Sequence, residues 1–288
     1  MEPQGGSIGR VFRIMGVVNV TPDSFSDGGA FLDRDAAVNH GLRLAFEGAD
    51  LLDVGGESTR PGADPVPERE ELARVIPVIE GIRARNTAVR ISIDTSKAAV
   101  AAAALDAGAE YVNDVTALRG DPDMAALVAE RGVDVCLMHM LGTPRTMQAE
   151  ARYDDVVLDV RAFLENRIEA AVAAGIALER IEVDPGIGFA KTVDHNLELL
   201  GRLRELTTLG RPLVLGTSRK SFLGKITGRE TAERMPATLA TVVMAYERGA
   251  EVFRVHDVAP ARDALVVAAA TLARPWPQTT PRTTTTTT

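Results

Sequence analysis

The stretch EGADLLDVGG, residues 47–56, carries three structural signals in ten residues. Gly48 follows a helix-like segment, and a glycine at such a place takes the left-handed conformation that closes the last helical turn. The run from Leu51 to Gly55 is short and mostly apolar, which is typical of a strand buried on both faces of a parallel sheet. The stretch therefore predicts a helix, a tight stop and a buried strand in direct succession.

The same succession recurs along the chain and predicts its fold. It is found again in DAGAEYVNDV, ERGVDVCLMH, AAGIALERIEVD and ERGAEVFRVHD, around Gly108, Gly132, Gly175 and Gly249. With the remaining apolar runs, eight strands are expected: Phe12–Val20, Leu51–Gly55, Arg90–Asp94, Tyr111–Val115, Val133–Met138, Ile181–Asp184, Pro212–Gly216 and Val252–His256. Eight strands alternating with helices favour a single-domain α/β fold, the (β/α)8 TIM barrel. An open doubly wound sheet is the alternative, but no GxGxxG motif follows the first strand.

The composition limits the classes of partner and of compartment. The chain has 288 residues, 45% hydrophobic and 25% charged, with a net charge of −8. An acidic chain argues against nucleic acid as a partner. No apolar run approaches the roughly 18 residues that a membrane span needs, and no secretory signal precedes the first strand. A single cysteine, Cys136, excludes an internal disulfide and fits the cytoplasm.

The two ends of the chain differ from its middle. Residues 1–10 contain several glycines and no periodicity, which predicts a flexible lead-in. The last fifteen residues, RPWPQTTPRTTTTTT at 274–288, cannot bury a core and are expected to be disordered. We therefore expect one barrel domain over residues 11–273.

A second stretch, IEVDPGIGFAKT at residues 181–192, indicates where the chemistry lies. A predicted strand runs into Asp184, and a turn follows that holds a proline, two glycines, an aromatic ring and a lysine. In a barrel the carboxyl ends of all strands open on one face, where side chains converge on a ligand. The polar residues at or just after these ends are Asn19, Asp94, Asn113, Asp114, His139, Asp184, Lys220, Arg254, His256 and Asp257.

Each of these residues also has a structural explanation when it is taken alone. Asp184 could cap the turn that follows it, and Asp94 could cap the next helix. His139 is expected to brace the rim rather than to bind a metal, because no HxH or HExxH spacing accompanies it. His40 and His195 fall within predicted helices and are expected to be structural. The coincidence of polar residues at every strand end favours a binding site over eight separate structural roles.

The residue types suggest two kinds of ligand chemistry. Asp94, Asn113 and Asp184 offer acceptors and an amide, which suit a flat heterocycle rich in N–H groups. Lys220 could bind phosphate, donate to the ring, or form a Schiff base as in barrel aldolases, and the residues alone leave these roles open. Residues suited to an anionic leaving group such as phosphate are Asn19, Arg254 and His256.

Seven stretches together resemble the dihydropteroate synthase family. They are MGVVNVTPDSFSDGG, DVGGESTRPGA, SIDTSKAAVA, MHMLGTPRTMQ, DPGIGFAKTVDHNLELL, GTSRKSFLG and FRVHDV, and the likeness runs from about Ile14 to Ala273. The resemblance implies a cytoplasmic (β/α)8 barrel that is usually a homodimer. It also implies the joining of 4-aminobenzoate to a dihydropterin-methyl diphosphate, with release of pyrophosphate, as a step of folate biosynthesis.

The resemblance also implies roles for individual residues. The pterin pocket would comprise Asp94, Asn113, Asp184, Lys220, Met138, Phe189 and Gly216. The diphosphate side would comprise Asn19, Thr59, Arg254 and His256, and the 4-aminobenzoate side Phe25, Thr59, Arg60, Pro61 and Ser221. Catalytic roles fall to Asn19, Asp27 and Lys220, with Asn19 approaching a Mg2+ cofactor and Asp27 stabilising a pterinyl-methyl cation.

Three alternatives remain beside this family. A methyltetrahydrofolate-corrinoid type of methyltransferase is a similar pterin-binding barrel, but it would not need the Arg254–His256 pair. A non-catalytic pterin-binding paralogue should have lost loop residues that are present here, such as Asn19 and Asp27. A Schiff-base aldolase would use Lys220. The sequence departs from the family pattern at NDVTALRG, residues 113–120, and at Leu141, which leaves the pocket near Thr116 less defined.

Overall fold

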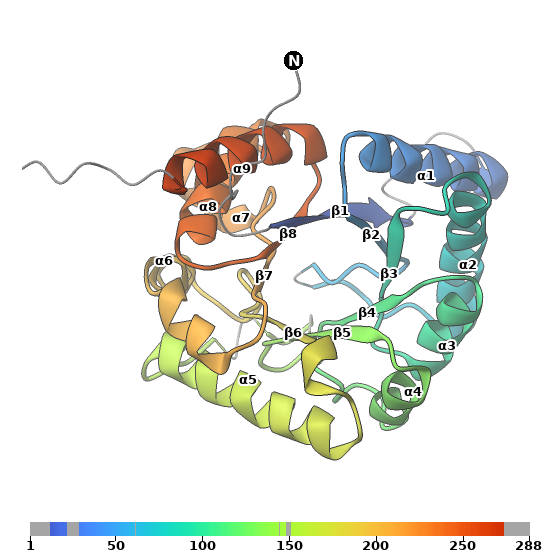
Figure 1. Ribbon diagram of the computed structural model, residues 1–288, viewed down its shortest axis with the longest axis horizontal. Coiled ribbons are helices and arrows are strands. Elements are labelled where there is room, and N and C mark those ends of the chain that lie inside the picture. Colours follow the sequence, from blue (N-terminus) through green and yellow to red (C-terminus); the bar gives the residue numbers. More distant parts are fainter. Residues whose placement is uncertain (1–11, 22–28, 61, 144, 148–150, 274–288) are drawn as a thin grey trace, which may run out of the picture.

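Eight strands form one parallel sheet in the part of the chain that the computed structural model describes, residues 12–21, 29–60, 62–143, 145–147 and 151–273. The strands are β1 (Arg13–Asn19), β2 (Leu51–Gly55), β3 (Arg90–Asp94), β4 (Tyr111–Asp114), β5 (Asp134–Met138), β6 (Ile181–Asp184), β7 (Val214–Leu215) and β8 (Val252–Val255). Their order is β6-β5-β4-β3-β2-β1-β8-β7, and a parallel bridge between Val183 and Leu213 joins the two edges. The sheet is therefore a nearly closed barrel, as Figure 1 shows along its axis, and the predicted (β/α)8 fold is confirmed.

The helices surround this barrel on the outside (Figure 1). They are α1 (Gly29–Phe46), α2 (Glu68–Arg85), α3 (Ala98–Asp106), α4 (Met124–Arg131), α5 (Val156–Ala173), α6 (Val193–Gly201), α7 (Ser221–Thr227), α8 (Met235–Glu247) and α9 (Val258–Leu272), with the 3-10 turns η2 (Leu178–Arg180), η3 (Leu203–Leu209) and η4 (Thr231–Glu233). The glycines that the sequence marked as helix stops, such as Gly48 at φ +99° and Gly108 at φ +108°, take the left-handed conformation. None of the helices in the described ranges has the length and apolarity required to cross a bilayer.

The bounds of β2, β3 and β6 are those predicted, the other strand bounds differ by at most two residues, and the largest difference is at β7. Only Val214 and Leu215 of the predicted Pro212–Gly216 strand are in the ladder. Pro212 has no N–H to donate, and its carbonyl accepts from Val183 across the closing edge at 3.0 Å. The proposed lead-in, residues 1–10, and the tail, 274–288, lie outside the described residues, as do Phe25, Asp27 and Pro61.

The barrel interior is apolar at the end where the strands begin and polar at the other. Six interior side chains pack there and are at most 1% exposed: Met15, Leu51, Tyr111, Cys136, Val214 and Val252. The Tyr111 hydroxyl donates to Glu182 at 2.9 Å, and Glu182 pairs with Arg13 at 2.5 Å, so the polar groups at the start of the strands are satisfied. Because side chains alternate along a strand, Leu51 and Asp53 of β2 share the interior face, and the carboxylate lies one layer nearer the carboxyl ends.

The turn after β6 explains the unusual composition of residues 185–191. Gly186 has φ +67°, and a Cβ at this position would lie 1.9 Å from the carbonyl oxygen of His139. The backbone of the turn thus packs against the end of β5 where no side chain fits. Gly188 is also left-handed at φ +84°, and the buried Ala190 at φ +50° is held by a 2.9 Å hydrogen bond from the Tyr153 hydroxyl to its carbonyl. This close packing fixes the position of Asp184, two residues before Gly186.

Gly186→Ala is expected to destabilise the protein more than Gly210→Ala. Both glycines are left-handed, Gly210 at φ +64°, but a Cβ at Gly210 would meet nothing within 4 Å. Backbone strain alone should cost Gly210→Ala about 1 kcal/mol, whereas the added clash should bring Gly186→Ala to about 2–4 kcal/mol. Urea denaturation of both variants measures the difference. Equal losses would mean that the turn does not pack on His139 as described.

Candidate active site

A buried carboxylate, Asp53, lies at the centre of the polar end of the barrel. Its Oδ1 accepts a hydrogen bond from the Ser92 hydroxyl at 2.5 Å. Its Oδ2 accepts from Asn113 Nδ2 at 3.0 Å and from Arg254 Nε at 2.6 Å. Asp53 therefore connects β2 to β3, β4 and β8, and its side chain is fully buried. Sequence analysis did not single out Asp53, although a carboxylate inside an otherwise apolar strand was the available signal.

Arg254 joins Asp53 to a second carboxylate, Asp94. The Arg254 Nη2 donates to Asp94 Oδ2 at 2.7 Å. Burial raises the pKa of Asp94 to about 7, and the Arg254 guanidinium opposes this rise. Burial acts to lower the pKa of Arg254, but Asp53 and Asp94 outweigh it, so that the pKa is raised overall. Arg254, predicted on the diphosphate side, is thus hydrogen-bonded directly to Asp94, predicted in the pterin pocket.

Asp184 and Lys220 form the opposite side of the interior. Asp184 Oδ1 accepts from the Gly186 backbone N–H at 2.7 Å, so this oxygen does cap the turn, while Oδ2 makes no hydrogen bond with the described residues. Lys220 Nζ donates to the Ile187 carbonyl and lies 4.6 Å from the centre of the Phe189 ring. Burial lowers the pKa of Lys220 to about 8 and raises that of Asp184, and each charge opposes the shift of the other.

The other predicted pocket residues lie against these groups. Met138, 4% exposed, packs in one cluster with Phe189. Gly216 lies beside two cationic side chains, because a Cβ there would be 3.8 Å from Lys220 Nζ and 3.8 Å from Arg254 Cβ. Asn113 retains its amide oxygen for a ligand, since only its Nδ2 is bonded within the described chain. The seven residues expected to form the pterin pocket therefore line a continuous part of the barrel interior.

The predicted anion-binding residues lie around the ends of β1 and β8. Asn19, the last residue of β1, is partly buried and pairs in register with Gly55 of β2. His256 follows β8, and its ring Nδ1 lies 3.0 Å from the Ser218 hydroxyl. Burial lowers the pKa of His256 to about 4, and the charges of Arg254 and Arg219 add to this effect. The imidazole is therefore neutral near pH 7 in the ligand-free site.

The loop between β2 and α2, which carries Thr59 and Arg60, is anchored by a buried ion cluster. Lys97 Nζ lies 2.5 Å from Glu57 Oε2 and 2.5 Å from Glu71 Oε2, and Glu71 is fully buried in α2. Glu57 Oε2 also accepts from the Val66 N–H at 3.1 Å, which ties the two ends of the loop together. Thr59 is partly buried and Arg60 exposed. Lys97 lies just beyond Asp94, so the loop is attached close to the pocket.

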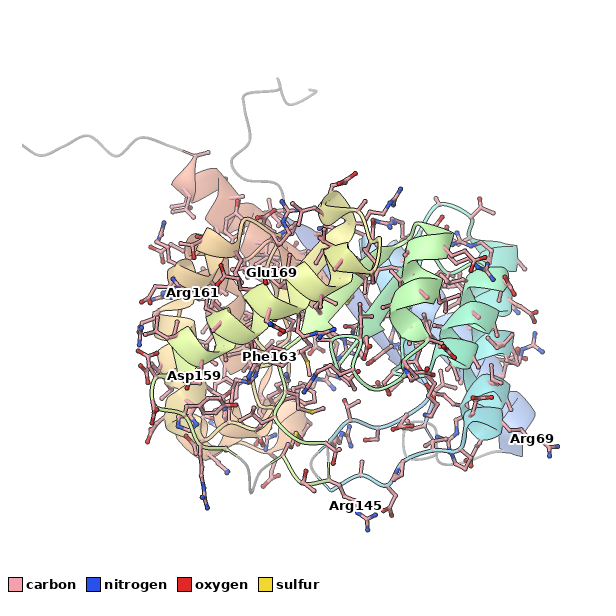
Figure 2. All side chains as sticks on the ribbon, turned by 90° about the horizontal axis from the view of Figure 1, so that it is seen from below. Arg69, Arg145, Asp159, Arg161, Phe163 and Glu169 are labelled. Atoms are coloured by element: carbon pink, nitrogen blue, oxygen red, sulfur yellow. The ribbon has the colours of Figure 1, made fainter. Side chains whose placement is uncertain are left out.

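Two further loops complete the rim of the barrel. Ser221 is exposed at the first position of α7, directly after Lys220, and shares no hydrogen bond with Thr59 or Arg60. Arg145, after β5, lies 3.8 Å from Asp64 in the β2–α2 loop. Figure 2 shows Arg145 beyond the ends of the helices, at one end of the barrel. A pair this exposed contributes little stability, but it places the two loops side by side over the mouth.

The remaining histidines have structural partners. His139 Nδ1 lies 3.0 Å from Nζ of Lys191, a buried lysine that also donates to the Phe189 carbonyl at 2.9 Å. Burial lowers the pKa of His139 to about 2 and that of Lys191 well below its usual range. His195 forms a capping box with Thr192 at the start of α6. His40 Nε2 lies 3.2 Å from a carbonyl of β1.

The sequence and structure of the chain were compared with those of known proteins. The pterin binding enzyme family matches residues 15–256. The dihydropteroate synthase of Mycobacterium leprae is 49% identical over 271 residues, which cover 90% of this chain and 93% of that protein. A Haloferax volcanii protein, named a probable bifunctional folylpolyglutamate synthase/dihydropteroate synthase, is 50% identical over 245 residues, and the chain spans only 29% of that longer relative.

Solved structures of a Xanthomonas albilineans dihydropteroate synthase are similar along most of the chain. The structure with 4-aminobenzoic acid has a TM-score of 0.87 at 52% identity and covers 92% of this chain and 94% of that one. The structure in complex with 7,8-dihydropteroate has a TM-score of 0.83 at 49% identity and covers 92% and 95%. The chain therefore belongs to the pterin-binding enzyme family. Within that family it belongs with the dihydropteroate synthases.

Lys97→Met is expected to lower the stability of the protein, because it leaves the buried Glu71 carboxylate without its cation. Glu71 Oε1 already has no hydrogen-bond partner among the described residues, so Oε2 depends on Lys97. Since Lys97 is partly exposed, we expect a loss of about 2 kcal/mol in the free energy of unfolding. Urea denaturation measures this loss.

Two comparison variants give this prediction its control. Arg131→Met breaks an ion pair with Asp106 that is largely exposed, and it should change stability far less than Lys97→Met does. Adding Glu71→Leu to Lys97→Met should restore most of the lost stability, because the carboxylate that remains, Glu57, is partly exposed to water. No recovery in the double variant would contradict the ion-cluster explanation.

Proposed function

We propose that this protein catalyses the joining of (7,8-dihydropterin-6-yl)methyl diphosphate to 4-aminobenzoate, giving 7,8-dihydropteroate and pyrophosphate. One observation carries the proposal beyond family membership. Two buried carboxylates, Asp94 and Asp184, face the same interior, and the arginine that binds Asp94 comes from the strand that also delivers His256. A ring that donates N–H groups and an anionic leaving group thus find complementary chemistry a short distance apart.

In this proposal the pterin ring lies between the two carboxylates. The unbonded Oδ2 of Asp184 accepts from ring N–H and amino groups, and Asp94 and the amide oxygen of Asn113 accept on the other side. Lys220, held by the Ile187 carbonyl and the Phe189 ring, donates to ring acceptors. Met138 and Phe189 contribute apolar contact, and the absence of a side chain at Gly216 leaves room beside Lys220 and Arg254.

The reaction proceeds by departure of diphosphate followed by attack of the amine. The bond between the methylene carbon and the diphosphate oxygen breaks, and its electron pair leaves with the diphosphate. Arg254 and His256 stabilise the charge that develops on the leaving oxygens, an interaction stronger in the transition state than in the substrate. The amine of 4-aminobenzoate then forms the new C–N bond and releases a proton. Asp27, proposed to stabilise the intermediate cation, lies outside the described residues.

A Mg2+ ion fits the residues on the diphosphate side. Asn19 offers a carboxamide oxygen, the type of ligand that Mg2+ accepts, and this side chain forms no hydrogen bond with the described residues. The described residues contain no group of three or more histidine, cysteine or acidic side chains that could hold a metal by themselves. This suits an ion that takes most of its ligands from diphosphate and water. When bound, the ion would neutralise charge on the diphosphate.

The 4-aminobenzoate is proposed to bind on the outer side of the pocket. Thr59 and Arg60 come from the anchored β2–α2 loop, and Ser221 from the start of α7. In this proposal Thr59 contacts both the 4-aminobenzoate and the diphosphate. Phe25 and Pro61, expected on the same side, lie outside the described residues. The Arg60 guanidinium supplies the positive charge that a carboxylate substrate requires.

The proposal also includes a homodimer. The apolar groove between α8 and α9, about 670 Å³ in volume, is lined by Leu239, Val243, Val267 and Leu272, and Val267 is 65% exposed. Figure 1 shows the two helices side by side on the outer wall. Apolar patches of this kind commonly mark interfaces. Sedimentation equilibrium of the protein and of Val267→Glu tests the proposed dimer; a parent protein that is monomeric at micromolar concentration would contradict it.

The proposed compartment is the cytoplasm, because the single buried cysteine fits a reducing compartment.

The direct test of the function is release of pyrophosphate by the purified protein. With the pterin diphosphate and 4-aminobenzoate together, pyrophosphate and dihydropteroate should form in equal amounts, as followed by a coupled phosphate assay and mass spectrometry. Without 4-aminobenzoate the release should be much slower. A protein that binds the pterin but never releases pyrophosphate would be a non-catalytic paralogue. A borohydride-trapped adduct on Lys220 would instead indicate a Schiff-base enzyme.

Asp184→Asn is expected to weaken pterin binding about ten- to a hundredfold while the protein stays folded. The amide oxygen can still accept from the Gly186 N–H, but the amide NH2 then faces the ring donors in place of Oδ2. Calorimetry with a hydroxymethyl-dihydropterin measures the affinity. Asp134→Asn is the matched control, since Asp134 begins β5 at the other end of the barrel and pairs with Arg90 and Arg180. Unchanged pterin affinity in Asp184→Asn would refute the assignment.

A further inference from the structure

Ser218, in the turn between β7 and α7, makes two hydrogen-bond contacts with one histidine. Its hydroxyl oxygen accepts from the backbone N–H of His256 at 3.1 Å. The same oxygen lies 3.0 Å from the ring Nδ1 of His256. Ser218 is 7% exposed, and the described residues offer its hydroxyl proton no other acceptor. The roles assigned to His256 above do not use this contact.

These contacts determine where the imidazole carries its proton. A serine hydroxyl has one proton to donate, and a buried hydroxyl needs an acceptor for it. The Ser218 oxygen has two lone pairs and could accept from both N–H groups, but its own proton finds an acceptor among the described residues only if Nδ1 is unprotonated. A neutral His256 consequently carries its proton on Nε2, and Nε2 has no hydrogen-bond partner within the described residues.

The surroundings favour a neutral imidazole over a charged one. Arg254, Arg219 and Arg60 all act to lower the pKa of His256, and only Asp257 acts in the other direction, while burial contributes most. A protonated ring would add a fourth positive charge to this group and would break the hydrogen bond from Ser218 to Nδ1. A neutral ring with a proton on Nε2 can still donate to an anion at the mouth of the barrel.

The turn that holds Ser218 is fixed by its neighbours. The Thr241 and Thr217 hydroxyl oxygens lie 2.8 Å apart, within hydrogen-bond distance. Arg219, left-handed at φ +57°, makes two bonds to Asp257 at 2.6 and 3.0 Å. The Arg219 N–H also donates to the Thr238 hydroxyl at 3.0 Å. Ser218 is therefore held between two anchored residues, and Arg219 ties the turn to Asp257, the residue that follows His256.

We propose that Ser218 is a positioning residue for the departure of diphosphate. Its hydroxyl holds His256 in the tautomer with the proton on Nε2, and this neutral N–H donates to the leaving diphosphate while Arg254 supplies the positive charge. The inference rests on the proposed function for the identity of the anion. The tautomer itself does not depend on that function.

The first test is the protonation pattern of the four histidines, read from nitrogen-15 chemical shifts at pH 7 in the ligand-free protein. His40 and His195 serve as internal references. The Nδ1 of His40 faces a guanidinium donor and its Nε2 a carbonyl, and the Nδ1 of His195 faces a backbone N–H, so both carry the proton on Nε2. His256 should show the same pattern. A proton on Nδ1, or on both ring nitrogens, would overturn the proposal.

The second test is a double-mutant cycle on the affinity for inorganic pyrophosphate, measured by calorimetry in a Mg2+ buffer. Ser218→Ala should weaken pyrophosphate binding about two- to tenfold and allow His256 to populate both tautomers. Ser218→Thr keeps the hydroxyl and should retain the parental affinity and the single tautomer. In a His256→Ala background, Ser218→Ala should have no further effect, because Ser218 acts through His256.

The outcomes separate this inference from the proposed function. If the parent protein did not bind pyrophosphate, the proposed diphosphate site would be wrong. If the parent bound pyrophosphate and Ser218→Ala weakened binding equally with and without His256, Ser218 would not act through the histidine and the inference would fail. The inference about Ser218 would also fail if the Ser218→Ala variant bound pyrophosphate with the parental affinity.

Discussion

The rest of the site depends on the ion pairs that the Arg254 guanidinium forms with Asp53 and Asp94. They place one partly buried cation between two buried carboxylates, at distances of 2.6 and 2.7 Å. Asp53 and Asp94 come from neighbouring strands, β2 and β3, while Arg254 comes from β8, across β1. Removing Arg254 would leave two buried carboxylates without their cation, at a cost of about 3–5 kcal/mol. The barrel and the site are thus stabilised by the same contacts.

This arrangement also couples the two halves of the proposed reaction. Arg254 donates a hydrogen bond to Asp94, which binds the pterin in the proposal. Two residues further along the chain is His256, whose ring contacts Ser218. A pterin that donated to Asp94 in place of Arg254 would change what Arg254 binds. Because burial brings the pKa of Asp94 to about 7, a small change in its partners alters its charge near neutral pH. In the proposed reaction the ring side and the leaving-group side therefore share the Arg254 side chain.

The sequence predicted the barrel because its signals are local. Glycines such as Gly48 and Gly108 end helices by a conformation that their neighbours cannot adopt, and short buried strands follow each one. It also predicted that polar side chains such as Asp184 and Arg254 lie at one end of the barrel, because the strand ends converge once eight strands close. It could not predict the partners: Asp53 and Arg254 are 201 residues apart, and only the register of the closed sheet brings them together. Ser218 and Lys97 were missed for the same reason, as each acts through a contact with another loop.

The most direct measurement is the pterin affinity of Asp53→Asn, determined by calorimetry together with its free energy of unfolding. The amide oxygen can accept from Asn113 and Arg254, and the amide NH2 can donate to the Ser92 hydroxyl oxygen, so the change removes chiefly the charge. Asp94 is then the only carboxylate that balances Arg254 and is less available to a ligand. We expect a folded protein that binds the dihydropterin at least about tenfold more weakly, although Asp53 is buried beneath the site. Parental pterin affinity in a folded Asp53→Asn protein would contradict the view that this charge pair organises the site.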